Sequence, residues 1–474
     1  MLKLLFLVFI SWVQLIGAVV PDCKSGTIIF DPPLDRSTVT WYPRNFTNNA
    51  PLYPNNYNCT YQINVPQGWF AEIQLTVSST TVQVIDQMGR VETTSSSNSE
   101  FFYFIANGGK LKLSTGVTSA NFGFSVLWKQ YDNPTYAHKY HVSKSEAVPF
   151  SYDLYGNKPI VVEAETRVSA TILPVNRYKT QYLRGIIYLD GPNFTSPCLG
   201  TGLQLLNGNT QFVSKGNFLT VLILGNSGSN PLLLFNDFYN MNGIKRFEAI
   251  QCDAICSEMK IDASKGRSVF QVDNGKSQYI LQKMTGFGKL DVYAGNLTPE
   301  KRNLIASYDL TADNHLSLPQ VFKGWFTTFV MESGNCTISQ TNSDAYSLNI
   351  DYGRKGIITS AEYGTSWKIQ DVVTKMYAPG NAKFQYSVKS VDLKTWDSLE
   401  VVGRNDQQVT FRQKYNSTNY PRLNQNVQFY ASEMDVIFDS ISLNTGFLMQ
   451  YSVEKSAVCQ SFWTIFVAVL VFLV

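Results

Sequence analysis

The fold is indicated by two short stretches, residues 123–128 (Gly-Phe-Ser-Val-Leu-Trp) and residues 446–451 (Gly-Phe-Leu-Met-Gln-Tyr). Each opens on Gly-Phe and reads as an alternating strand. This period of two is typical of a strand with one buried face and one solvated face. Each stretch closes a segment of roughly 100 residues, the size of one β-sandwich domain. We therefore expect related sandwich domains near the two ends of the chain.

Strand patterns continue through the rest of the sequence. Apolar and polar residues alternate at 72–77 and 110–113, whereas residues 219–224 and 231–235 read as fully buried strands. Turn residues such as those at 107–109 separate the patterns. No long stretch shows a helical period with caps. The sequence predicts an all-β protein built from antiparallel sandwiches of about eight to ten short strands each.

The first segment carries the more specific motifs. These are Cys23, residues 53–63 (Tyr-Pro-Asn-Asn-Tyr-Asn-Cys-Thr-Tyr-Gln-Ile) and residues 65–68 (Val-Pro-Gln-Gly). They resemble the CUB domain, an extracellular β-sandwich, and more closely the CUB-like domain of a large nematode family of secreted and surface proteins. The resemblance implies tandem jelly-roll sandwiches and a disulfide between Cys23 and Cys59.

The chain divides into five expected parts. These are a signal peptide at 1–18, a CUB-like domain at 21–131, a β-rich middle region at 132–344, a second and degenerate CUB-like domain at 345–455, and a hydrophobic C-terminal segment at 456–474. The second CUB-like domain rests on residues 356–360 and 388–403 and has no internal cysteines. The middle region is long enough for one or two further sandwich units. A single all-β domain of different topology is the alternative there.

Both ends of the chain predict export. Residues 4–15 form a short apolar run after Lys3, and Ala18 offers a small residue for cleavage. Residues 461–474 end the chain in apolar residues without a basic flank, which is typical of a GPI-attachment signal, with Ser456 as the attachment residue. A short membrane-spanning anchor and a secreted tail are the alternatives. We expect the protein on the extracellular side of the plasma membrane, including membrane rafts, or secreted.

Glycosylation sequons and cysteines agree with an oxidising, extracytoplasmic compartment. The six sequons begin at Asn45, Asn58, Asn193, Asn296, Asn335 and Asn416. Pro299 follows the Asn296 sequon and is expected to weaken it. Of the seven cysteines, Cys198, Cys252, Cys256 and Cys336 can pair in three ways, and the sequence does not choose among them. Cys459 is the odd one, beside the segment expected to be removed.

Little in the sequence points to catalysis. A net charge of +3 and 16% charged residues do not favour nucleic acid as a partner. The three histidines, His138, His141 and His315, lie in no catalytic or zinc-binding motif, and we expect no cofactor. Many CUB domains hold calcium, for which the second CUB-like domain offers Asp392, Asp397 and Asp439, and the first offers Asp86. The ordinary interpretation of these acids is a solvated loop.

The resemblance implies a non-enzymatic surface protein that binds protein or glycan ligands and is held to the membrane by its C-terminal segment. In the family such proteins are often tied to innate defence against bacteria. One alternative is a structural surface or matrix barrier protein without a specific ligand. Another is a glycan-binding module that uses Trp41, Tyr42 and Trp69, residues for which core packing is the simpler interpretation. The third is an enzyme with an unrecognised site in the middle region.

Overall fold

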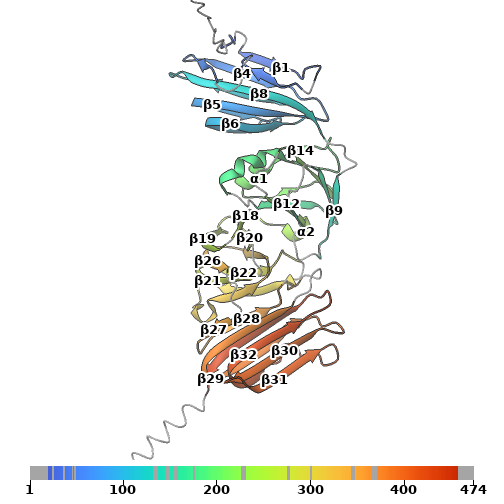
Figure 1. Ribbon diagram of the computed structural model, residues 1–474, viewed down its shortest axis with the longest axis vertical. Helices are drawn as coiled ribbons and strands as arrows, with labels where there is room; N and C mark the ends of the chain where they lie inside the picture. The colour runs from blue at the N-terminus through green and yellow to red at the C-terminus, as the bar shows by residue number, and fades with distance from the viewer. Residues whose placement is uncertain are drawn as a thin grey trace, which may run out of the picture.

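The computed structural model describes residues 20–23, 26–35, 38–44, 46, 50–131, 137–145, 150–153, 158–173, 177–225, 231–252, 254–274, 278–298, 301–342, 347–361, 363–364 and 371–456. The expected signal peptide, the tail beyond Ser456, Asn45 and Cys459 lie outside these residues. The described chain is dominated by strands in six sheets, which confirms the all-β fold class. Four β-rich units follow one another along the long axis of the molecule, as Figure 1 shows.

The first unit is one eight-stranded sheet folded into a sandwich, in the order β1-β4-β7-β5-β8-β2, with β3 beside β8 and β6 beside β5. Its strands are β1 (Thr27–Phe30), β2 (Thr40–Tyr42), β3 (Leu52–Tyr53), β4 (Asn58–Ile63), β5 (Trp69–Ile85), β6 (Val91–Phe104), β7 (Gly109–Ser114) and β8 (Ala120–Gln130). The long β5 pairs with β8 over its first half and with β7 over its second. One bent strand therefore belongs to both layers.

The two Gly-Phe stretches turn out to need glycine for different reasons. Gly123 lies inside β8 rather than at its start, because β3 pairs with Ala120 and Asn121 and extends the strand. A side chain at Gly123 would meet the Phe46 ring at 2.9 Å. Gly446 does precede its strand and has a φ of +75°, a backbone conformation that favours glycine. The expectation that both strands open on Gly-Phe holds only at Gly446.

The second unit packs two sheets, β14-β13-β16-β11-β9 and β10-β17-β12-β15, around one apolar core. Its elements are β9 (His138–Val142), β10 (Phe150–Asp153), β11 (Ile160–Ala164), β12 (Val168–Leu173), the 3-10 helix η2 (Arg177–Gly185), β13 (Ile186–Leu189), β14 (Cys198–Thr201), α1 (Gly202–Asn207), β15 (Phe212–Val213), β16 (Phe218–Ile223), β17 (Leu232–Asp237) and α2 (Phe238–Met241). The buried strands expected at 219–224 and 231–235 are β16 and β17.

The third unit also holds two sheets, β18-β20-β25-β22-β23 and β19-β26-β21-β24. Its elements are β18 (Arg246–Gln251), β19 (Ile255–Asp262), β20 (Ser268–Asp273), β21 (Gln278–Phe287), β22 (Lys289–Ala294), β23 (Leu304–Asp309), the 3-10 helix η4 (His315–Ser317), β24 (Gln320–Lys323), β25 (Phe326–Met331) and β26 (Asn335–Asn342). The described part of residues 132–344 thus contains two pairs of sheets.

The fourth unit is a seven-stranded sheet in the order β28-β33-β29-β32-β30-β31, with β27 beside β29. Its strands are β27 (Ser347–Asn349), β28 (Lys355–Thr359), β29 (Val372–Val391), β30 (Ser398–Asn405), β31 (Gln408–Asn416), β32 (Val427–Asp439) and β33 (Phe447–Lys455). All of these strands contribute to its apolar core, β27 through the partly buried Leu348 packed against it. That this unit is a second CUB-like domain stays a prediction.

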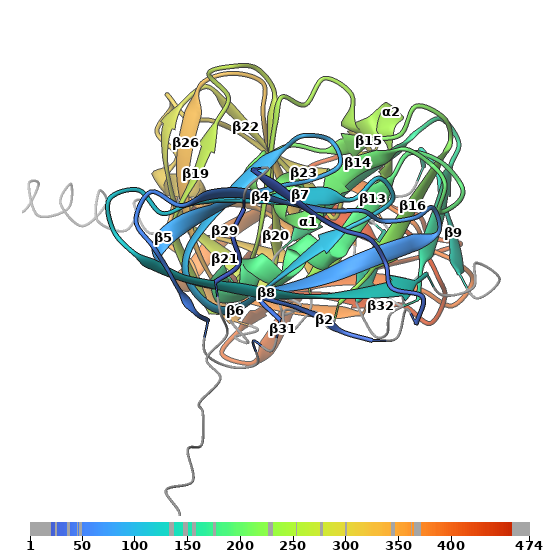
Figure 2. The same cartoon turned by 90° about the horizontal axis from the view of Figure 1, so that it is seen from above.

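Side-chain contacts join the units. Arg184 of η2 forms ion pairs with Glu92 and Glu100 of the first unit. An apolar cluster beside them includes Phe70 of the first unit and Leu222 of the second. Seen along the long axis, the first unit lies over α1 (Figure 2). Gln204 of α1 donates a hydrogen bond to Asp86 of the first unit at 3.1 Å. The two units are therefore joined by both charge and apolar packing.

Candidate binding site at the loop end of the fourth unit

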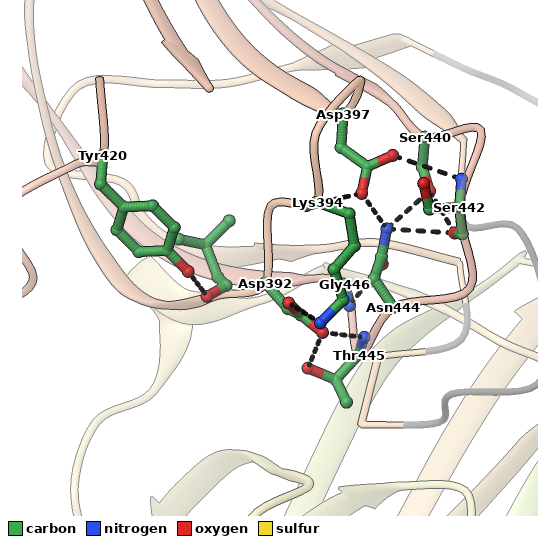
Figure 3. Close-up of polar contacts among 10 residues, drawn as sticks. Asp392, Lys394, Asp397, Tyr420, Ser440, Ser442, Asn444, Thr445 and Gly446 are labelled. Carbon is green, nitrogen blue, oxygen red and sulfur yellow. Dashed lines mark hydrogen bonds and ion pairs between the residues drawn. The ribbon is translucent and has the colours of Figure 1, made fainter. Parts of the chain in front are cut away.

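Two loops at one end of the fourth unit are joined by a network of hydrogen bonds. The first loop, residues 392–397, connects β29 to β30, and the second, residues 440–446, connects β32 to β33. Both loops are short and lie at strand ends, so the sheet fixes their starting points. Figure 3 shows their polar side chains converging on one another.

Asp397 holds the two loops together. Its Oδ2 accepts hydrogen bonds from the backbone N–H of Lys394 and from the side-chain amide of Asn444, both at 2.9 Å. Its Oδ1 accepts from the backbone N–H of Ile441 at 3.1 Å. The same oxygen accepts from the backbone N–H of Ser442 at 3.3 Å (Figure 3). The carboxylate is only 1% exposed. A buried charge is stable only when hydrogen-bonded, and here four donors surround it.

A second contact fastens the far end of the same loops. Asp392 Oδ2 accepts from the Thr445 N–H at 3.1 Å, and Asp392 Oδ1 pairs with the Lys394 ammonium at 2.9 Å. Hydrogen bonding to Asp392 raises the pKa of Lys394. Both loops are therefore fixed at two points, which limits the conformational entropy that a partner would have to remove.

The outer side of the clamped loops is apolar. Trp396 is 75% exposed, Ile441 62% and Leu443 59%. All three directly neighbour residues of the clamp in sequence. We call Trp396, Ile441 and Leu443 the apolar tip. Exposed aromatic and aliphatic groups on a rigid support are features of binding surfaces. The sequence does not single out these three residues, because in it the two segments show only strand ends and acidic calcium candidates.

The calcium interpretation of this loop end is not supported. Calcium needs six to eight oxygen ligands, whereas both oxygens of Asp397 already face N–H donors. Asp439 is exposed at the end of β32. Among the described residues, no group of three or more His, Cys, Asp or Glu side chains could hold a metal ion. Asp86 likewise serves as an acceptor, with Oδ1 receiving the N–H groups of Met88 and Arg90.

The described residues form two disulfides, Cys23–Cys59 and Cys252–Cys256. The first is the pair that the CUB resemblance implies, and the second is one of the open choices. Within the described part of the chain, Cys198 and Cys336 are free. Burial raises the pKa of the Cys336 thiol to about 12, so it is a poor nucleophile at neutral pH.

The sequons differ in their accessibility. Asn58, Asn193 and Asn335 are exposed and Asn416 is half-buried. In the Asn193 and Asn416 sequons, the threonine hydroxyl donates to the asparagine Oδ1, at 2.8 and 2.9 Å. Asn296 is 2% exposed, and its Oδ1 accepts from Gln271 at 3.0 Å inside the third unit. The prediction of a glycan at Asn296 is therefore wrong for this fold, because a sugar has no room there.

The remaining candidates lie apart from the loop end. His138 and His141 lie on β9. Tyr42 is buried, and Trp41 and Trp69 are half-buried, with Trp41 packed edge-to-face on Phe46. Core packing thus accounts for the first-unit aromatics proposed as sugar platforms. Ser456 is buried directly after β33, and its role as an anchor residue stays a prediction.

Comparison with known protein families assigns a domain type to the N-terminal sandwich. Residues 18–132 match the model of the CUB-like domain. The chain therefore contains a CUB-like domain. Residues 141–224 and 239–343 match two domains of unknown function, DUF7592 and DUF7591. CUB-like domains are typically extracellular, non-catalytic binding modules.

Two solved structures show similarity to this chain at low sequence identity. The CUB1-EGF-CUB2 region of human MASP-1/3 is 9% identical, with 42% of this chain and 98% of that chain covered and a TM-score of 0.18. The corresponding region of rat MASP-1 is 8% identical, with 43% and 99% covered and a TM-score of 0.17. Scores this low carry no argument about architecture. No curated protein matches the sequence. Within the described residues, no helix has the length and apolarity to span a bilayer.

Proposed function

We propose that this chain is a non-enzymatic binding protein of the cell surface, and that its apolar tip contacts the ligand. The observation that carries the proposal is the clamp on Asp397, which holds Trp396, Ile441 and Leu443 exposed on two fixed loops. Exposed apolar side chains that gather in one patch mark interaction sites, and tryptophan is enriched among the interface residues that contribute most to affinity. The CUB-like domain supports an extracellular binding role.

The biological setting we propose is innate defence against bacteria at the extracellular face of the membrane, with a lipid anchor or a short C-terminal segment holding the protein there. An anchor would display many copies on one surface, so weak contacts by single copies would add through avidity. The ligand in this setting is a protein or glycan on the bacterial surface.

Binding to intact bacteria tests the proposal. The ectodomain would be displayed on beads, and retention of fluorescent bacteria would be compared between wild type and a Trp396→Ser, Leu443→Ser double variant. We expect retention to fall at least tenfold in the double variant. Val409→Ser is the matched control, because Val409 is an exposed apolar residue of the same unit, on β31, and lies outside the loops.

Two results would contradict the proposal. Equal retention by wild type and the double variant would remove the tip as the contact surface. No saturable retention by the wild type would favour a structural barrier protein without a ligand. Release of the cell-bound full chain by phosphatidylinositol-specific phospholipase C is the separate test of the lipid anchor.

A further inference from the structure

A small cavity lies at the joint between the third and fourth units. The volume of the cavity is about 20 Å³, which is enough for one water-sized molecule or ion. Its wall includes Lys323 of β24, Thr359 of β28 and Thr374 of β29. The joint beside it is closed by two hydrogen bonds between the Gln320 side chain and the Ile357 backbone, at 2.9 and 3.1 Å. The cavity is therefore built from both units.

Lys323 places a charge in this joint. The residue is 8% exposed, and its ammonium donates to the Val373 carbonyl of β29 at 3.2 Å. Within the part of the chain that the structure describes, Lys323 forms no ion pair. An ammonium has three donors, and a buried charge without an opposite charge is costly. The surroundings favour a negative group.

The hydroxyl groups in the wall also lack partners. Thr359 is 3% exposed, and among the residues that the structure describes neither its Oγ1 nor the buried Oγ1 of Thr374 has a hydrogen-bond partner. A buried hydroxyl without a partner costs free energy. Each hydroxyl can donate a hydrogen bond to an acceptor in the cavity. The site thus combines one cation, two hydroxyl donors and space for one small particle.

We propose that this cavity binds a single small monovalent anion of the size of chloride, held by the Lys323 ammonium and the hydroxyls of Thr359 and Thr374. The anion neutralises the buried charge and gives both hydroxyls an acceptor. Because its ligands come from β24, β28 and β29, it also fastens the third unit to the fourth. A water molecule would satisfy the hydroxyls but would leave the charge uncompensated.

The experiment compares unfolding of the full ectodomain in sodium chloride and in sodium gluconate at matched ionic strength. Gluconate is too large for the cavity, so only chloride should stabilise the folded state by mass action. At about ten times the dissociation constant, the unfolding equilibrium should shift about elevenfold. Lys323→Met should abolish this difference between the salts. Lys414→Met is the control and should retain it, because Lys414 is an exposed lysine on β31.

Anomalous diffraction tests the anion site directly and does not depend on whether Lys323→Met folds. Crystals of the wild type grown in sodium bromide should show an anomalous peak within hydrogen-bond distance of Lys323 Nζ. A water molecule or a protein carboxylate at that position would overturn the proposal. Equal stabilisation of wild type in chloride and gluconate would also overturn it.

Discussion

The Asp397 carboxylate accepts a hydrogen bond from the Asn444 side-chain amide at 2.9 Å, and both residues are 1% exposed. They belong to different loops, and each is the inner neighbour of an exposed apolar residue: Asp397 follows Trp396, and Asn444 follows Leu443. The same bond therefore joins the two loops that carry the exposed apolar side chains.

Replacing Asp397 with Asn should destabilise the fourth unit. The amide nitrogen would face N–H donors in place of an acceptor, and hydrogen bonds to a charged group contribute about 1.5–3 kcal/mol each. We expect a loss of about 3 kcal/mol in unfolding free energy. Urea unfolding would measure it, and hydrogen exchange of the Ile441 and Ser442 amides should accelerate.

Asp439→Asn is the matched control for that change. Asp439 is exposed at the end of β32, so its substitution should alter the unfolding free energy by less than about 0.5 kcal/mol. Equal effects of the two substitutions would show that the clamp contributes nothing specific.

Arg184 is expected to couple the first two units. Its guanidinium donates to Glu92 at 2.8 Å and to Glu100 at 2.7 Å, and lies 4.2 Å from the centre of the Phe102 ring. Arg184→Ala would leave these carboxylates without their cation. Breaking such a pair costs about 3–5 kcal/mol when it is fully buried, and we expect about 2 kcal/mol here because Glu92 is partly exposed.

Hydrogen exchange along β6 would report the loss at this joint. Arg412→Ala is the control, since the Arg412–Glu400 pair has an Arg side chain that is 62% exposed and should contribute under about 1 kcal/mol. Unchanged exchange in β6 after Arg184→Ala would mean that the ion pairs of Arg184 do not stabilise the contact between the two units.

Local patterns predicted strands better than sites. Alternation and buried runs identified β16, β17 and β33 because side-chain polarity records which face is covered. The role of Asp397 could not be predicted this way, because its carboxylate accepts hydrogen bonds from the backbone N–H groups of residues 441 and 442. Backbone donors leave no trace in residue type. The burial of Asn296 could not be predicted either, because the sequon has the same three-residue pattern whether it lies inside a domain or on its surface.

The glycosylation pattern should follow this burial. Mass spectrometry of the secreted ectodomain should find sugar on Asn193 and Asn416, where the threonine hydroxyl already contacts the acceptor amide, and none on Asn296. Asn193→Gln should shift the protein on a gel by the mass of one glycan. Asn296→Gln should leave the mobility unchanged but lower stability, because it disrupts the buried bond to Gln271. A glycan found on Asn296 in the folded protein would contradict the described packing of the third unit.

Burial of Lys323 should make the unfolding free energy depend on pH. Burial lowers the pKa of Lys323 to about 8 from its usual 10.5, so between these values the unfolded chain binds more protons than the folded chain. Stability therefore rises with pH in this window, and the cost of the buried charge is fully present below pH 8. The other titratable group in the cavity wall is Tyr451, whose pKa burial raises.

The measurement is the difference in unfolding free energy between wild type and Lys323→Met, in gluconate buffer without chloride. Groups other than Lys323 titrate in both proteins and largely cancel in the difference. From about pH 7.5 to about 9.5, wild type should gain about 2 kcal/mol relative to the variant. Chloride should move this rise to higher pH, because an anion beside the ammonium favours its charged form. A flat difference across the range would mean that Lys323 keeps an ordinary pKa and that its charge is already compensated within the protein.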